Sequence, residues 1–315
     1  PPLPPKKFFP SLLHVDDLLP SIEGREDFSH EHREFYSYID YRYVQDDSFD
    51  DPLRLECRGI KFDREGFIIA RPLQKFFNHG EKNTLINSKS QHKLMDQLDG
   101  SMVHPVVVDG VFYLMTRKGV SDVAEEALTH VSDALEEWCR SEIDQGNTPI
   151  FEYTSPTNQI VVKYGKPQLT LIGIRDMMDG TYLKMEGCEV PAPIVHTYDS
   201  IYETDVFVKG VREMVGIKGY VVRYQNGHTI KIKTDEYVLK HRAVSDVSSN
   251  SGRVMRQLVL SGTADDVLPM LDEDRAARLR EYSDRVNEYV NDAEGTVKGI
   301  LEAGAFIDRK SFATD

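Results

Sequence analysis

The stretch IKGYVVRYQNGHTIKIKT, residues 217–234, decides the fold of the region around it. β-Branched and aromatic residues predominate on both sides of Asn226-Gly227, a dipeptide typical of two-residue hairpin turns. The pattern predicts antiparallel strands over 219–224 and 229–232. Lys231 and Lys233 are two residues apart in the second strand, so their side chains lie on one face of the sheet.

This pair of lysines is typical of an anion site. Two ammonium groups on one face repel each other unless an anion, most naturally a phosphate, lies between them. Residues 218–242 contain six lysines and arginines but only two acidic residues. A solvated edge strand that lysines protect from pairing is the other interpretation, and the pattern alone leaves both open.

Outward from this hairpin, the chain alternates expected strands and turns. Residues 28–69 indicate a meander, Val103–Met115 a hairpin turning at Asp109-Gly110, and residues 150–153, 159–162 and 169–174 three more strands. Between them, Ser121–Ile143 has apolar residues at three- and four-residue steps and predicts one amphipathic helix.

The composition changes after about residue 242, where a polar connector leads into helical periodicity amid mixed charges. We therefore expect an α+β fold. A mostly antiparallel-sheet domain, residues 1–242 with a proline-rich N-terminal extension, would precede a small all-helical domain, residues 243–315. The chain ends directly after a helical stretch, which leaves open that this second domain is cut short.

The overall composition excludes several classes of protein. The chain has 315 residues and a net charge of −14, which argues against non-specific coating of nucleic acid. No apolar run approaches the roughly 20 residues of a membrane-spanning helix. Cys57, Cys139 and Cys188 lie far apart without metal-ligand spacing. We expect no disulfide, no structural zinc, no membrane association, and a cytoplasmic location.

Two further segments carry chemically informative residues. DQLDGS, residues 96–101, is a polar turn ahead of a hairpin, and FEY, residues 151–153, places Glu152 in a strand among aromatic and apolar neighbours. A carboxylate in such a strand needs a partner, for which a metal or a sugar is suitable. An ordinary outward-facing glutamate remains the alternative.

Taken in order, these segments resemble the covalent nucleotidyltransferase superfamily and, more narrowly, the bacteriophage RNA ligase 1 family, which repairs broken tRNA anticodon loops. The resemblance runs from about Arg33 to Arg242. It includes LECRGI at 55–60, RPLQKFFN at 71–78, FEYTSPTN at 151–158 and KIKTDEYV at 231–238. It implies an antiparallel-sheet adenylyltransferase domain. Capping enzymes and DNA ligases are disfavoured, because they carry a β-rich OB-fold where this chain is helical.

The resemblance also implies a three-step reaction. A lysine in a Lys-x-Asp-Gly motif attacks the α-phosphate of ATP, AMP passes to an RNA 5′-phosphate, and an RNA 3′-hydroxyl then displaces AMP. The implied cofactors are ATP and Mg²⁺, with Mn²⁺ as a substitute. The implied partner is RNA with 5′-phosphate and 3′-hydroxyl ends, cleaved tRNA among the candidates, bound by a monomer in the cytoplasm of a host cell.

Each matching residue inherits an implied role. Asp99 and Gly100 match the Asp-Gly of the motif, Glu152 matches a strand glutamate near the ribose, and Asp99 and Glu152 are the implied metal residues. Lys231 and Lys233 match the lysines on the α-phosphate. The other implied ATP-binding residues are Ile172 and Val221 around the adenine, Arg175 in the same strand motif, Arg58, Lys75, Tyr41 and Tyr237 at the outer phosphates, and Lys118 after the hairpin.

Two positions depart from the family pattern. Gln97 stands where the family has its nucleophilic lysine, and Lys218 where it has a glutamate. A carboxamide nitrogen is not a nucleophile at neutral pH. The exchange of a carboxylate for an ammonium changes the local charge by two units, against binding of a divalent metal there. The 13-residue step from Lys218 to Lys231 is the usual one, which argues against misalignment.

Three explanations remain open. The substitutions are deliberate, to trap bound ATP or to force use of a pre-adenylylated RNA donor; or the chain is a natural homologue that has lost step one and binds nucleotide or RNA; or Lys218 or Lys93 has replaced the nucleophile. We expect no covalent AMP after incubation with ATP and magnesium, and weak sealing of pre-adenylylated RNA. A Gln97→Lys, Lys218→Glu revertant would separate an altered enzyme from a binding module.

Overall fold

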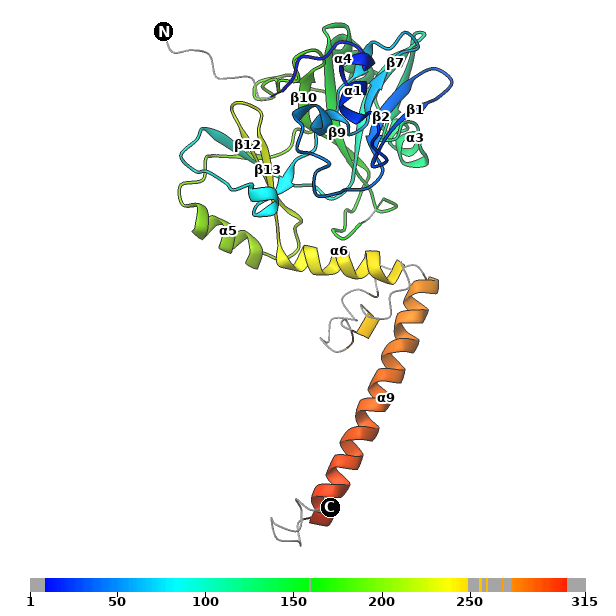
Figure 1. Ribbon diagram of the computed structural model, residues 1–315, viewed down its shortest axis with the longest axis vertical. Coiled ribbons are helices and arrows are strands. Elements are labelled where there is room, and N and C mark those ends of the chain that lie inside the picture. The colour runs from blue at the N-terminus through cyan, green and yellow to red at the C-terminus, as the bar shows by residue number, and fades with distance from the viewer. Residues whose placement is uncertain are drawn as a thin grey trace. The chain divides into compact units, whose positions relative to one another are not determined.

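The computed structural model describes residues 9–158, 160–248, 255–256, 259, 268 and 273–304 (Figure 1). The chain divides into two compact units, Pro1–Tyr237 and Val238–Asp315. The first unit holds every described strand, and the described part of the second consists mainly of α6 (Asp235–Ser248) and α9 (Glu273–Gly304). The helical residues expected between 249 and 272 lie almost entirely outside the described ranges.

Thirteen strands lie in the described part of the first unit. Their bounds are β1 Phe28–His32, β2 Ser37–Tyr41, β3 Ile60–Phe62, β4 Ile68–Ala70, β5 Phe77–Asn78, β6 His92–Asp96, β7 Ser101–Val108, β8 Val111–Met115, β9 Asn147–Thr154, β10 Gln168–Asp176, β11 Thr197–Tyr198, β12 Gly219–Tyr224 and β13 Thr229–Lys233. They form three sheets, ordered β1-β2-β3-β4, β10-β9-β7-β8 and β11-β6-β12-β13-β5. Every pairing is antiparallel except that of β13 with β5.

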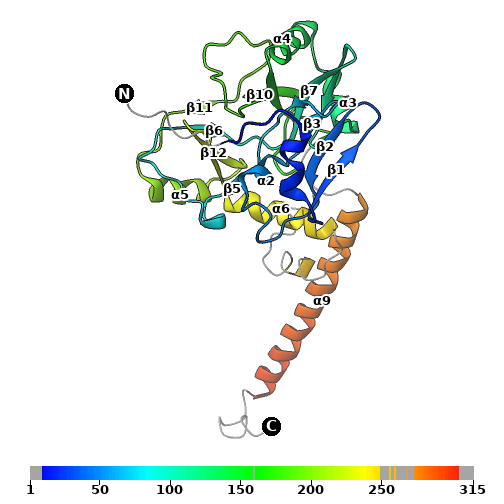
Figure 2. The ribbon, with the colours of Figure 1, turned by 45° about the horizontal axis from the view of Figure 1, so that its top comes forward.

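The helices of the first unit are short. They are α1 Leu19–Ile22, α2 Pro52–Glu56, α3 Asp122–Leu128, α4 Asp133–Asp144 and α5 Thr204–Glu213, with 3-10 turns at Val15–Asp17 and Glu81–Asn83. α5 lies beside the five-stranded sheet (Figure 2), where Val208 and Val211 join a core with Val222 and Ile230. No described helix combines the length and apolar composition that crossing a membrane requires. The expected α+β fold with antiparallel sheets and a C-terminal helix is confirmed.

The hairpin of the opening stretch is formed as predicted, with Gly227 at a φ of 91° in its turn. β12 lies between β13 and β6, so three strand ends meet on one side of the sheet. The Gln97 N–H donates to the Gly219 carbonyl over 2.9 Å, and the Thr234 N–H donates to the Lys218 carbonyl over 3.1 Å. The chain segments that carry Gln97, Lys218 and Lys233 are therefore direct neighbours.

Two local predictions were wrong. The single helix expected over Ser121–Ile143 is two helices, because Ser132 caps α4 by accepting from the Leu135 N–H just as Ser121 caps α3. The strand expected over 159–162 is absent from residues 160–162. There the N–H groups of Val161 and Val162 donate to the carboxylate of Asp99 instead of to a neighbouring strand.

A buried ion cluster joins the first two sheets to the N-terminal segment. Glu56 in α2 accepts from Arg71, which follows β4, over 3.0 Å and from Arg175 in β10 over 2.7 Å. All three side chains are at most 1% exposed. Arg71 also donates to the carbonyl of Pro10 over 2.9 Å. Charges this deeply buried persist only when paired and hydrogen-bonded, so the cluster fixes the relative positions of these elements.

Candidate functional site

A cavity of about 250 Å³ opens where the ends of β6, β12 and β13 face β9 and β10. We call it the lysine cavity. It is lined by Arg58, Leu73, Phe76, Met95, Asp96, Gln97, Leu98, Gly100, Met102, Glu152, Ile172, Val195, Lys218, Val221, Arg223, Lys231 and Lys233. Nine of the fifteen site residues expected from the sequence are among them. Five cationic side chains against two carboxylates give its walls a surplus of positive charge.

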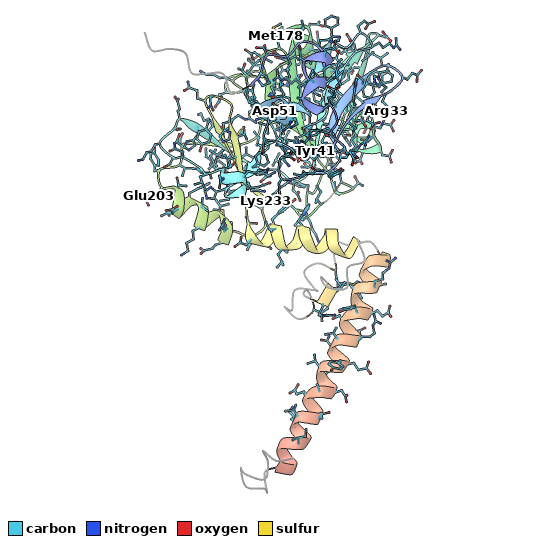
Figure 3. The ribbon with its side chains drawn as sticks, viewed as in Figure 1. Arg33, Tyr41, Asp51, Met178, Glu203 and Lys233 are labelled. Carbon is cyan, nitrogen blue, oxygen red and sulfur yellow. The ribbon has the colours of Figure 1, made fainter. Side chains whose placement is uncertain are left out.

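Lys231 and Lys233 both line this cavity and are half-buried. Figure 3 labels Lys233 at the end of β13. Burial, followed by the neighbouring charges of Lys233 and Lys75, lowers the pKa of Lys231 to about 7. Burial and the charge of Lys218 lower the pKa of Lys233 in the same direction. Ammonium groups held together against their charge indicate a site for a polyanion.

Asp99 does not line the cavity, but its fully buried side chain contacts Lys218, which does. Its Oδ1 atom accepts from the Tyr237 hydroxyl over 2.7 Å and lies 3.2 Å from Lys218 Nζ. Its Oδ2 atom accepts from the N–H groups of Val161 and Val162. Burial alone would raise the pKa of Asp99, but Lys218 and the three hydrogen bonds outweigh it and leave the pKa below its usual value. Asp99 is therefore a firmly ionised partner of Lys218.

Glu152 reaches the cavity from the middle of β9, where it is paired with Thr170 of β10 and Met102 of β7. Its Oε1 atom accepts from the Gly100 N–H over 3.0 Å. Burial raises the pKa of this carboxyl, although the charge of Lys218 opposes the shift. A side chain at position 100 would collide with the Tyr153 carbonyl, so a glycine is required to bring the turn this close to β9.

The carboxylates at the cavity are poorly arranged to hold a divalent cation by themselves. Both oxygens of Asp99 are already engaged by four donors, and Lys218 brings an ammonium beside them. No group of three His, Cys, Asp or Glu suited to a metal occurs among the described residues. Mg²⁺ prefers several oxygen ligands in octahedral geometry. The protein residues alone therefore do not form a ready cation site, and the metal role expected for Asp99 and Glu152 remains a prediction.

Besides Asp99, five of the expected residues do not line the cavity. Tyr237 lies below it, bonded to Asp99, and burial raises the pKa of its hydroxyl. The Lys75 ammonium is 5.2 Å from the centre of the Tyr41 ring, beside the cavity (Figure 3 labels Tyr41). Arg175 is fully buried in the ion cluster with Glu56, and Lys118 is exposed in the turn after β8.

Three residues at or near the site were not expected. Arg117 sits over the Tyr41 ring at 4.4 Å and pairs with Asp40 over 3.1 Å. Phe76 lies 5.2 Å from Lys231 Nζ, and Arg223 lines the cavity while its guanidinium stacks 3.8 Å from Tyr182. Arg223 could have been predicted from the sequence, because it lies two residues from Val221 in the same strand and therefore on the same face of the sheet.

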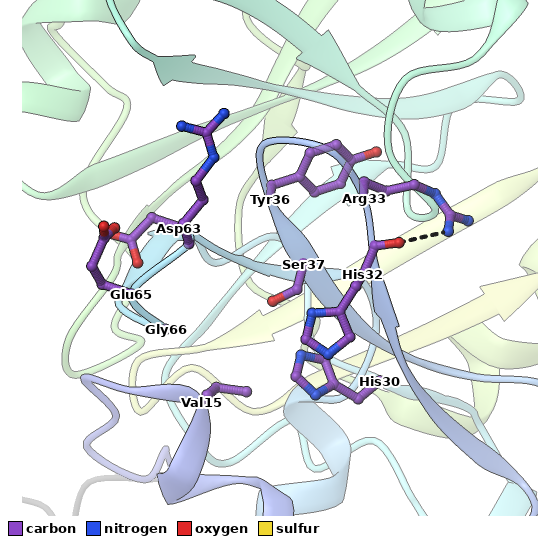
Figure 4. A pocket seen from close by; sticks show the side chains of 10 residues that line it. Val15, His30, His32, Arg33, Tyr36, Ser37, Asp63, Glu65 and Gly66 are labelled. Atoms are coloured by element: carbon purple, nitrogen blue, oxygen red, sulfur yellow. Dashed lines mark hydrogen bonds between the residues drawn. The ribbon is translucent and has the colours of Figure 1, made fainter.

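A second cavity, of about 270 Å³, lies between β1, β2 and the β3–β4 turn. Figure 4 shows the neighbouring rings of His30 and His32 in it, which are tilted by 48° to each other, with Arg33 donating to the His32 carbonyl. It contains none of the residues expected in the site. Two larger cavities, of about 500 and 450 Å³, are likewise lined by none of them. The lysine cavity is therefore the candidate functional site, although it is smaller than these three.

Comparison with known proteins identifies the family of the chain. The profile of a family described as RNA ligase matches residues 56–239, more than half of the chain. A protein named "Putative RNA ligase" from Thermovibrio ammonificans is 29% identical over 307 residues, covering 90% of this chain and 79% of its own length. RNA ligase 1 of bacteriophage TS2126 is 24% identical, covering 62% of this chain and 54% of its own length.

A further relative is the "Putative bifunctional polynucleotide kinase/RNA ligase" of Autographa californica nuclear polyhedrosis virus, 26% identical over 84% of this chain and 41% of its own length. The fold is similar to that of an archaeal ATP-dependent RNA ligase, with a TM-score of 0.55, 15% identity, and coverage of 84% of this chain and 75% of that one. A putative ATP-dependent DNA ligase from Aquifex aeolicus gives a TM-score of 0.52. With the match spanning both Glu152 and the two-lysine strand, the chain belongs to the RNA ligase family.

Proposed function

We propose that the chain joins RNA 5′-phosphate and 3′-hydroxyl ends through an RNA–adenylate, with ATP as the source of AMP. The single observation that carries the proposal is the pair Lys231 and Lys233, held half-buried in the lysine cavity that Glu152 also lines. Cleaved tRNA is the substrate that the resemblance to the phage family favours.

The cavity suits the parts of an adenine nucleotide. Ile172 and Val221 offer apolar surface from neighbouring sheets, and the cationic residues Arg58, Lys231 and Lys233 offer charge for phosphates. Glu152 offers a carboxylate for a ribose hydroxyl or for a Mg²⁺ ion that arrives with the nucleotide. A metal bound there would neutralise triphosphate charge. The chain's own contribution is to orient the α-phosphate against its lysines.

Position 97 cannot carry AMP in this chain. The nitrogen of the Gln97 carboxamide is delocalised into its carbonyl and has no lone pair for attack on phosphorus. We therefore propose that adenylylation is blocked at this position and that the later steps, which do not need the missing lysine, are retained in weakened form.

Sealing of a pre-adenylylated RNA donor tests this function directly, because it bypasses step one. We expect slow joining to an acceptor with a 3′-hydroxyl, and no joining by a Lys231→Met, Lys233→Met variant. A Lys298→Met variant is the matched control, since this exposed lysine of α9 pairs only with Glu294 among the described residues. Absence of joining by the unaltered chain would contradict the proposed activity.

The second candidate function is a nucleotide- or RNA-binding protein without ligation. The presence of Lys218 where the family has a glutamate favours this second function, because Lys218 forms an ion pair with Asp99 and adds positive charge to the cavity. In that case ATP binds, but neither the chain nor its Gln97→Lys, Lys218→Glu double variant seals RNA.

A further inference from the structure

Residue 218 brings a primary amine into the cavity in which position 97 offers only a carboxamide. In the five-stranded sheet β12 lies between β6 and β13, so Lys218, directly before β12, stands between Gln97 and Lys233. The hydrogen bonds from Gln97 to Gly219 and from Thr234 to Lys218 fix this placement. Neighbouring strands are about 4.8 Å apart, which the four-carbon stem of a lysine easily spans.

The Lys218 side chain faces the cavity and is mostly shielded from solvent. It is 14% exposed and lines the cavity together with Gln97 and Glu152. Asp99 holds its Nζ atom at 3.2 Å, and the Tyr237 ring centre lies 5.5 Å from it. The Gln97 Oε1 atom is buried with no hydrogen-bond partner in the described part of the chain. This oxygen is therefore free to accept a hydrogen bond from a bound molecule or from water.

We propose that Lys218 is the nucleophile of this chain, accepting AMP from ATP in place of the lysine that position 97 lacks. The inference rests on the proposed function, because it supplies the first step of the same reaction. The other lysine considered from the sequence, Lys93, does not fit. It lies outside the lysine cavity, is 58% exposed, and pairs with Glu186 over 3.5 Å.

The step balances without a further reactant. The Lys218 ammonium first gives one proton to water. The neutral Nζ atom then forms a bond to the α-phosphorus while the bond from that phosphorus to the bridging oxygen breaks, and pyrophosphate leaves with the electron pair. Loss of a second proton to water gives the neutral phosphoramidate nitrogen of a lysyl–AMP. Lys231 and Lys233 face the same cavity and stabilise the charge that develops on the phosphate oxygens.

A purely structural role is the competing explanation, because Lys218 also neutralises the buried Asp99. Intact-mass measurement of the full chain after incubation with ATP and magnesium distinguishes the two. The sequence alone led us to expect no covalent AMP, but the placement of Lys218 in the cavity reverses that expectation. We now expect an increase of one AMP that is labile in acid, as a phosphoramidate is. Peptide mapping is expected to place it on Lys218. Mapping needs no variant, so it decides the question even if substitutions impair folding.

Two variants sharpen the test. Lys218→Arg keeps a positive charge beside Asp99 but removes the nucleophilic amine, and we expect the adduct to fall at least a hundredfold. Lys93→Arg is the matched control and should keep it. An adduct on another residue, or one that persists in Lys218→Arg, overturns the inference. No adduct on a chain that seals pre-adenylylated RNA overturns it while sparing the proposed function, and no adduct together with no sealing overturns both.

Discussion

The pH dependence of ATP binding follows from the position of Lys231. In the protein without nucleotide its pKa is lowered to about 7, so Lys231 is mostly neutral at pH 8.5 and must take up a proton to bind a polyphosphate as an ammonium. If bound ATP keeps Lys231 charged at every pH in this range, the affinity for ATP is proportional to the fraction of nucleotide-free protein in which Lys231 is protonated. That fraction falls from about 0.9 at pH 6 to about 0.03 at pH 8.5, which weakens binding roughly 30-fold, or about 2 kcal/mol. The lowered pKa of Lys233 acts in the same direction.

Isothermal titration calorimetry measures both consequences. Affinity is followed across this pH range, and titrations at pH 8.5 in two buffers of different ionisation enthalpy report the protons taken up, which we expect to be close to one. Lys231→Arg is the reference, because arginine stays charged at every pH. The protonation of ATP itself affects both proteins equally and cancels in the comparison. Parallel pH profiles for the unaltered chain and this variant would refute the reasoning.

Three further predictions concern other contacts. Glu56→Gln leaves two buried guanidinium groups without their carboxylate, and urea unfolding should show a loss of about 3–5 kcal/mol; a loss below about 1 kcal/mol contradicts the account of the ion cluster. Arg117 lies over Tyr41, which is expected at the outer phosphates, so Arg117→Ala should weaken binding of ATP about tenfold in calorimetry but that of AMP little. Lys118→Ala, at an exposed neighbour, should change neither affinity. Equal effects of the two variants would contradict this placement of Arg117. In the protein without nucleotide, the free energy of unfolding should rise from about pH 7 towards pH 10 in urea titrations, because the unfolded chain binds a proton that folded Lys231 lacks; Lys231→Arg should remove this part of the rise.

Much of the fold was predictable because its signals are local. Asn226-Gly227 and Asp109-Gly110 fix two hairpins through turn geometry alone, and Gly227 and Gly110 have the positive φ values that such turns require. The alternation in β13 placed Lys231 and Lys233 on one face, which is where the cavity lies. The alternation of residues in the strands and the turn dipeptides were therefore enough to predict which face of the sheet carries the two lysines.

The remaining features depend on contacts between distant segments. The failed strand at 160–162 could not be foreseen, because its N–H groups are taken by Asp99, some sixty residues earlier. Arg175 matched a nucleotide-site motif, yet it is enclosed by Glu56 and by the Pro72 carbonyl. Arg117 went unnoticed beside Lys118 because only the folded turn shows which of the two neighbours meets Tyr41.

The hydrogen bond from Arg71 to the Pro10 carbonyl attaches the first described residues to the folded domain. Leu12, Val15 and Leu18 are buried with Ile39 and Ile60, and the Leu12 N–H donates to the Met178 carbonyl. A shortened chain that starts beyond Leu18 would leave the buried Arg71 without the Pro10 carbonyl as an acceptor and would expose apolar surface of the core. Any trimming intended to obtain a smaller catalytic fragment has to spare this leading segment.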